Sequence, residues 1–126
     1  MKILGIDYGT KNIGLALSDD TQKLAFAYKT LNKLNLISEL KEICDKEKIE
    51  KIIVGLPIGL SGEDTQTTEL VKEFINNFKK EINIPVQTVD ERLSTVQASR
   101  MENKNAQNSI DELSAQVLLQ GYLDRH

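Results

Sequence analysis

With 126 residues, 40% of them hydrophobic, the chain is long enough to bury a core without disulfides or a structural metal, and we expect one domain over residues 1–126. The only cysteine and the only histidine, Cys44 and His126, exclude Cys/His zinc sites, Ser-His-Asp triads and cysteine-histidine dyads, so any catalysis must use carboxylates. The net charge of −3 argues only weakly against nucleic-acid binding, because bound cations can neutralise the acids of a metal-dependent nuclease.

The sequence has no apolar run near the roughly 20 residues that span a bilayer. Its N-terminus runs straight into a strand pattern without a signal segment. We therefore expect a cytoplasmic protein without membrane association.

The first half of the chain has the pattern of three strands and a helix. Apolar and β-branched residues predict strands over Lys2–Tyr8, Asn12–Ser18 and Lys23–Thr30, and this order favours an antiparallel meander. Apolar residues then recur with helical spacing from Leu34 to Lys48, and Cys44 falls on that apolar stripe.

In the second half, strands and helices alternate. Ile52–Gly55 is wholly apolar, as expected of a strand covered on both faces, and a loop that contains Gly62 follows it. A helical stripe from Leu70 to Phe78, capped by Asp64, precedes a predicted buried strand over Pro85–Val89.

Two further helices are expected after the capping-box patterns that begin at Ser94 and Ser109. Right-handed crossovers place the fourth strand beside the first, which leaves the first strand central. The sequence thus predicts an α/β fold with a five-stranded mixed sheet, three antiparallel strands and then two parallel ones, and helices on both faces.

Asp7 lies near the end of the apolar first strand, where Gly5, Gly9 and Gly14 surround it. An ionised carboxylate is costly to desolvate unless a cation or a dense set of hydrogen bonds compensates it. Metal ligation is the functional interpretation, and a strand-end aspartate bonded to turn amides is the structural alternative.

Two other acids belong near Asp7 in the predicted fold. Ligands of open α/β sheets gather at the carboxyl ends of the strands, where Glu91 follows the fifth strand, and Asp111 opens the last helix. Three carboxylates from separate elements suit Mg²⁺, and two such ions about 3.5–4 Å apart can activate water and stabilise the leaving oxygen of a phosphodiester. As structural alternatives, Glu91 pairs with Arg92 in solvent, and Asp111 stabilises a helix N-terminus.

Phosphate contacts are expected from the side chains of Lys11 and Arg92 and from backbone amides near Gly9, Gly14 and Gly62. For each of these residues taken singly, a solvated charge or an ordinary turn glycine is the alternative.

Four ordered blocks at domain-scale spacing cover essentially the whole chain: Gly5–Ala16, Val54–Pro57 with Gly62 downstream, Asp90–Thr95 and Asp111–Gln120. Together they resemble the YqgF family of ribonuclease H-like proteins. That RuvX-like family is also described as Holliday-junction-resolvase-like and is linked to pre-16S rRNA maturation.

The resemblance implies a ribonuclease H-like nuclease domain in which Asp7, Glu91 and Asp111 are catalytic residues that bind two Mg²⁺ or Mn²⁺ ions. The implied reaction is endonucleolytic hydrolysis of a phosphodiester in the 5′-end processing of pre-16S rRNA, with RNA and a ribosome precursor as partners. Related folds commonly carry a carboxylate on the fourth strand. Here that strand ends in Gly55, so the second acid comes from after the fifth strand.

One segment departs from the family pattern, because Met101–Asn108 supplies a single lysine where members often have several basic residues. Two alternatives stay open: a resolvase-like nuclease for branched DNA, and a non-catalytic adaptor in ribosome assembly or transcription. The Asp-x-Gly-Thr motif also resembles the phosphate loop of actin-like ATPases, but 126 residues supply only one of the two domains which that clamp needs.

Overall fold

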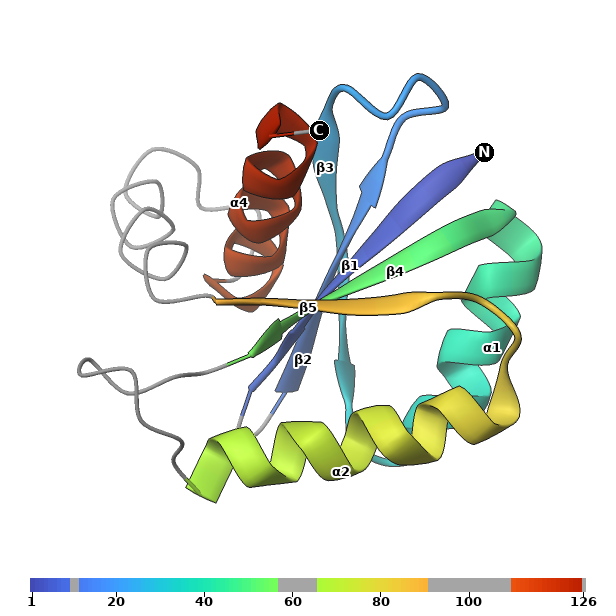
Figure 1. Cartoon of the computed structure of the whole chain (residues 1–126), viewed down its shortest axis with the longest axis vertical. Coiled ribbons are helices and arrows are strands. Elements are labelled where there is room, and N and C mark those ends of the chain that lie inside the picture. The colour runs from blue at the N-terminus through green and yellow to red at the C-terminus, as the bar shows by residue number, and fades with distance from the viewer. Residues whose placement is uncertain (10–11, 57–65, 91–109, 126) are drawn as a thin grey trace.

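A five-stranded sheet with the order β3-β2-β1-β4-β5 lies at the centre of the molecule (Figure 1). The computed structural model describes residues 1–9, 12–56, 66–90 and 110–125. The strands are β1 (Lys2–Tyr8), β2 (Asn12–Ser18), β3 (Ala25–Asn32), β4 (Ile49–Leu56) and β5 (Val86–Asp90). The first three strands are antiparallel, β4 is parallel to β1, and β5 is parallel to β4. The predicted strand order and the central place of β1 are confirmed.

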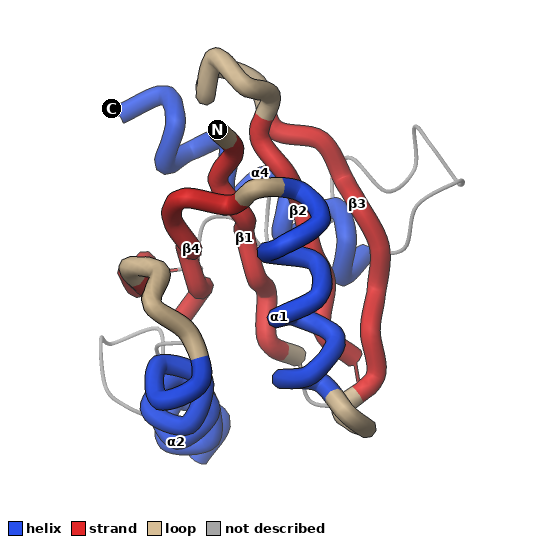
Figure 2. Tube along the Cα trace, turned by 90° about the vertical axis from the view of Figure 1, so that its right-hand side faces the viewer, coloured by secondary structure: helices blue, strands red, loops and turns tan. Residues whose placement is uncertain are grey.

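Helices cover both faces of this sheet, as predicted. α1 (Leu36–Glu47) and α2 (Gln66–Glu81) lie on one face, and α4 (Ile110–Arg125) lies on the other. In Figure 2, α1 lies in front of β1 and β2, and α4 lies behind them.

Side chains of β1 alternate between two cores, one on each face. Leu4 and Ile6 pack in the larger core with α1 and α2, whereas Ile3 packs in the smaller core with α4. Gly5 also faces α4, and a Cβ atom at Gly5 would lie 2.9 Å from the Cβ of Leu119. Since real Cβ contacts are essentially never that short, no larger residue fits at Gly5 unless α4 moves.

β4 is longer than predicted at its N-terminal end. It begins at Ile49 because Lys48, the C-cap of α1, has a left-handed φ of 56° and turns the chain directly into the sheet. The amide of Lys2 donates a hydrogen bond of 3.3 Å to the carbonyl of Lys48. The apolar stretch Ile52–Gly55 is buried throughout, as predicted for a strand covered on both faces.

β3 covers Ala25–Asn32 and not the predicted Lys23–Thr30, because the turn before it is longer than expected. The Oδ1 atom of Asp19 accepts hydrogen bonds from the amides of Lys23 at 2.9 Å and Leu24 at 3.3 Å. These two bonds keep both residues in the turn, so pairing with β2 starts only at Ala25.

β5 is an edge strand, and the prediction that it is buried was wrong. The side chains of Gln87 and Thr88 are exposed, and those of Val86 and Val89 are only partly buried. α4 packs mainly on β1, β2 and β3, and Val89 of β5 lies at the margin of the core that α4 covers.

α1 lies within the predicted range Leu34 to Lys48 and is shorter at both ends, because Asn35 and Lys48 have left-handed φ angles of 57° and 56°. Cys44 lies on the buried stripe of α1, as predicted. Burial raises the pKa of its thiol to about 11, so the thiol stays protonated and unreactive.

Several predicted features lie outside the described residues: the loop with Gly62, the Asp64 cap, and the capping-box patterns at Ser94 and Ser109. In the part of the chain that is described, no helix combines the length and the apolar character needed to cross a membrane.

Candidate active site

Asp7 is flanked by glycine on both neighbouring strands. Asp7 of β1 pairs in register with Gly14 of β2 and with Gly55 of β4. Residues that pair across adjacent strands point to the same face of a sheet. Therefore neither neighbouring strand places a side chain directly beside the carboxylate of Asp7.

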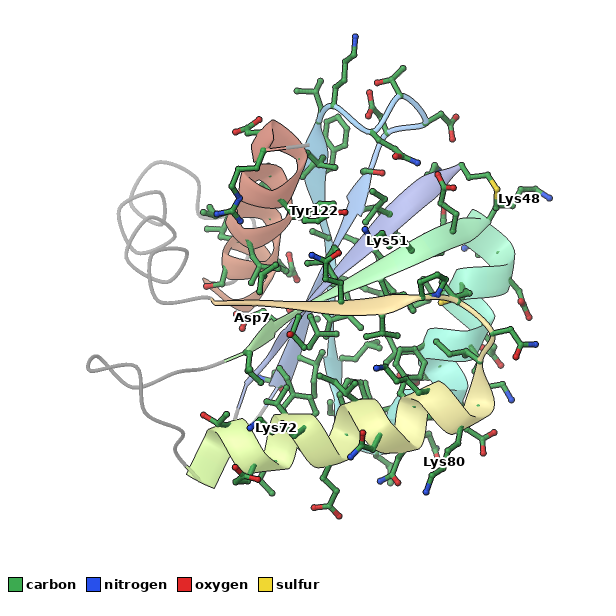
Figure 3. All side chains as sticks on the ribbon, viewed as in Figure 1. Asp7, Lys48, Lys51, Lys72, Lys80 and Tyr122 are labelled. Atoms are coloured by element: carbon green, nitrogen blue, oxygen red, sulfur yellow. The ribbon has the colours of Figure 1, made fainter. Side chains whose placement is uncertain are left out.

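The side chain of Asp7 belongs to the face that α4 covers. Successive strand residues point to opposite faces, so Asp7 shares its face with Gly5, which touches α4. Tyr8 points the other way and packs against Phe74 of α2, with 4.9 Å between the ring centroids. Figure 3 shows Asp7 toward the end of the sheet where α4 begins.

The packing of α4 brings the backbone of Asp111 to the same end of the sheet. Ile3 lies beside Tyr122 and Leu123 in the last turn of α4, and Gly5 lies nearest Leu119, about one turn earlier. Along this face, later residues of β1 therefore contact earlier turns of α4. Two strand residues advance about 6.6 Å and four helix residues about 6 Å, so the next step leads from Gly5 to Asp7 and from Leu119 to Ala115, which lies one turn of α4 after Asp111.

The first turn of α4 is also tied to the edge strand β3. The hydroxyl of Thr30 donates a hydrogen bond of 3.0 Å to Oε1 of Glu112. Thr30 pairs with Gly14, which pairs with Asp7, so these three residues lie in one row across the sheet. Sequence reasoning noted Glu112 only as the acid of a capping-box pattern, and no local signal links it to a residue 82 positions away.

The carboxylate of Asp7 is partly buried, and within the described residues no hydrogen bond or ion pair reaches it. The neighbouring turn uses its own backbone instead, since the amide of Gly9 donates to the carbonyl of Asn12 at 3.0 Å. The alternative in which Asp7 is bonded to turn amides thus has no support among these residues. A partly buried carboxylate of this kind fits an oxygen ligand for a divalent cation.

Most of the other predicted site residues cannot be placed. Four of them lie outside the described residues: Lys11, Gly62, Glu91 and Arg92. The side chain of Asp111 also lies outside, although its backbone is part of α4. The side chains that are described contain no cluster of three or more metal-ligating groups. The roles of these residues stay predictions.

Comparison with known proteins adds independent information. Residues 1–125 match the sequence profile of a family described as "RuvX: Holliday junction resolvase". A protein of Maridesulfovibrio salexigens described as "Putative pre-16S rRNA nuclease" is 38% identical, and the alignment covers 99% of this chain and 99% of that protein. A Clostridium kluyveri protein with the same description is 40% identical, over 99% of this chain and 98% of that protein.

Solved structures resemble the fold at low sequence identity. Thermus thermophilus RuvC in complex with a Holliday junction substrate matches with a TM-score of 0.67 and 14% identity, over 99% of this chain and 95% of that chain. The yeast mitochondrial Holliday junction resolvase Ydc2 matches with a TM-score of 0.53 and 13% identity, over 96% of this chain and 77% of that chain. At these identities the likeness shows the fold alone, and it confirms the predicted ribonuclease H-like fold.

Proposed function

The chain belongs to the RuvX family of nucleases, and on this premise we propose that it is a metal-dependent endonuclease that hydrolyses a phosphodiester bond in the 5′-end processing of pre-16S rRNA. The observation that supports this proposal most is the setting of Asp7. Its carboxylate lies near the end of the central strand, between Gly14 and Gly55, at the end of the sheet where α4 begins.

We propose that Asp7, Glu91 and Asp111 bind one or two Mg²⁺ or Mn²⁺ ions. When bound, such ions activate a water molecule and stabilise the leaving oxygen of a phosphodiester. Asp7 suits this role because no described side chain competes for its carboxylate. The absence of side chains at Gly14 and Gly55 lets a phosphate group approach the backbone on either side.

The protein's own contacts hold the first turn of α4 in a defined place. The Thr30–Glu112 hydrogen bond fixes that turn against β3, and the contact of Gly5 with Leu119 fixes how close α4 lies to the sheet. Both contacts therefore control where Asp111 stands relative to Asp7, so they position a proposed ligand without touching the substrate themselves.

For the substrate phosphates, Lys11, Arg92 and Gly62 stay the proposed contacts. Gly9 has a narrower proposed role, because its amide already donates to the carbonyl of Asn12. We propose that Gly9 allows close approach of the substrate backbone and is not itself a donor.

Branched DNA is the second candidate substrate, because the family description and the RuvC complex both name Holliday junctions. RNA is preferred because the relatives that match over nearly their whole length are described as acting on pre-16S rRNA. We propose a cytoplasmic location on the same ground, since bacterial ribosomal RNA is transcribed and processed there.

Cleavage assays test the proposal. Purified protein is incubated with a labelled 5′ fragment of pre-16S rRNA, and separately with a four-way DNA junction, in Mg²⁺ or in EDTA. We expect Mg²⁺-dependent cutting of the RNA, which Asp7→Asn abolishes. Asp20→Asn is the matched control because Asp20 is exposed in the turn after β2, at the opposite end of the sheet, and this variant should cut like the wild type.

Each other outcome has a distinct meaning. Full activity of Asp7→Asn, or of the wild type in EDTA, would contradict the metal mechanism. Cutting of the DNA junction without cutting of the RNA would identify branched DNA as the substrate. Binding of RNA by a wild type that cuts neither substrate would favour the adaptor.

A further inference from the structure

A groove of about 480 Å³ opens between α1 and α2, on the face of the sheet opposite Asp7. We call it the Tyr8 groove, and the residues that matter for its chemistry are Tyr8, Lys33, Asn35, Glu73, Phe74 and Asn77. Tyr8 is the last residue of β1 and directly follows Asp7, so the groove and the candidate active site lie at the same end of the central strand.

The ring of Tyr8 is held in place from the side of the core. It packs against Phe74 at 4.9 Å between centroids, and Phe74 stacks on Phe78 at 5.5 Å. The ammonium nitrogen of Lys33 lies 4.8 Å from the centroid of the Tyr8 ring. Lys33 is exposed, and an exposed cation–π contact is worth only about 0.5–1 kcal/mol, so this side chain gives way easily to a flat ligand.

The polar groups of the groove suit a neutral, planar ligand with polar edges. Asn35 and Asn77 offer amide donors and acceptors, while the charges of Lys33 and Glu73 offset one another. The hydroxyl of Tyr8 adds a further hydrogen-bond donor. Nucleobases have apolar faces and hydrogen-bonding edges and stack on aromatic side chains, whereas phosphate-rich duplex would need a surplus of positive charge.

The position of the groove connects it to the cleavage site. Asp7 and Tyr8 are consecutive residues on one strand and point to opposite faces. Consecutive Cα atoms lie about 3.8 Å apart, so a phosphate bound at Asp7 and a base bound at Tyr8 would share the same end of β1. This continuity favours a part of the same RNA over an unrelated peptide.

We propose that the Tyr8 groove binds the base of an unpaired nucleotide next to the cleaved bond, with the base on the Tyr8 ring and its phosphate beside Lys33. The inference rests on the proposed function, because it takes the ligand to be the RNA substrate. It predicts that the enzyme needs a single-stranded nucleotide on one side of the cut.

Equilibrium binding of a labelled single-stranded oligoribonucleotide tests this proposal without cleavage, in a buffer with Ca²⁺ in place of Mg²⁺. Tyr8→Leu keeps an apolar contact with Phe74 but removes stacking, and we expect about ten-fold weaker binding. Lys33→Ala should weaken binding too. Its matched control is Lys29→Ala, which removes the same charge from an exposed lysine whose ammonium lies 5.5 Å from the Tyr28 ring, outside the groove.

A second measurement does not depend on the stability of a variant. RNA that carries 5-iodouridine beside the scissile position is photocrosslinked to the wild-type protein, and the crosslinked residue is identified by mass spectrometry. A crosslink at Tyr8, together with a larger loss of binding for Lys33→Ala than for Lys29→Ala, supports the proposal.

Equal losses for the two lysine variants, with no crosslink in the groove, would overturn the proposal. The binding role of the groove and the proposed nuclease activity can be refuted separately. Mg²⁺-dependent cleavage with unchanged binding of Tyr8→Leu removes only the groove inference. A Tyr8 crosslink in a protein that cuts no RNA removes only the proposed nuclease activity.

Discussion

Gly5 and Leu119 are so close that a Cβ atom added to Gly5 would lie 2.9 Å from the Leu119 Cβ, which means that α4 rests directly on the backbone of β1. Gly5→Ala is expected to force α4 away from the sheet and to lower the free energy of unfolding by about 1–3 kcal/mol, measured by urea denaturation. RNA cleavage should fall as well, because Asp111 moves with α4.

Gly121→Ala is the matched control for that substitution. Among the described residues, a Cβ at Gly121 would meet only Nη2 of Arg125, at 4.0 Å, and alanine is a better helix former than glycine. We expect this variant to gain about 0.5–1 kcal/mol. If Gly5→Ala proved as stable as the wild type, the close contact between α4 and β1 would not contribute to the free energy of unfolding.

Binding of Mg²⁺ at Asp7 should be visible in thermal stability. Because a ligand stabilises only the state that binds it, added Mg²⁺ should raise the melting temperature of the wild type and raise that of Asp7→Asn much less. Without metal, Asp7→Asn should melt no lower than the wild type, since no described hydrogen bond or ion pair is lost. The same Mg²⁺ shift in both proteins would place the ion elsewhere.

The Thr30–Glu112 hydrogen bond predicts a positioning role for Glu112. Glu112→Ala should cost about 1–2 kcal/mol of stability and lower kcat more than it raises KM, because the first turn of α4 loses its tie to β3. Glu112→Gln keeps an oxygen that accepts from Thr30, and it should restore most of the activity. Loss of all activity in Glu112→Gln would instead identify Glu112 as a metal ligand.

Lys48 offers a stabilising substitution remote from the site. It ends α1 with a φ of 56°, a conformation that strains residues with a Cβ atom. Lys48→Gly is expected to raise the free energy of unfolding by about 1 kcal/mol. Lys46→Gly, in the last turn of the same helix, should lower it by about as much. Thermal melts of the two variants should therefore move in opposite directions.

The sequence predicted the strands because the apolar pattern of each is local, and the right-handed crossover rule then placed β4 beside β1. β1 and β2 begin and end where the alternation does, and the buried stretch of β4 is visible as Ile52–Gly55. The predictions are wrong where a distant contact or a turn determines the boundary or the burial of a strand. The turn hydrogen bonds of Asp19 delay β3, and the exposure of β5 depends on where α4 packs.

In the candidate site, too, some features could be predicted from the sequence and others could not. Asp7 is recognisable from sequence, because one acid in an apolar strand is unusual. Its glycine neighbours across the sheet are not, since strand register depends on pairing between segments far apart in the chain. The Thr30–Glu112 contact likewise could not be predicted from the sequence. The roles of Glu91 and Asp111 stay predictions because their side chains are not described.

Among the described helices, α4 alone covers the Asp7 face, and this has a consequence for biosynthesis. A nascent chain that has emerged through β5 contains the whole sheet, but Ile3, Ile53 and Ala16 still lack the cover that α4 supplies. Such an intermediate exposes an apolar surface to solvent and lacks Asp111. Until α4 docks, the nascent sheet would therefore present a surface that favours aggregation and chaperone binding.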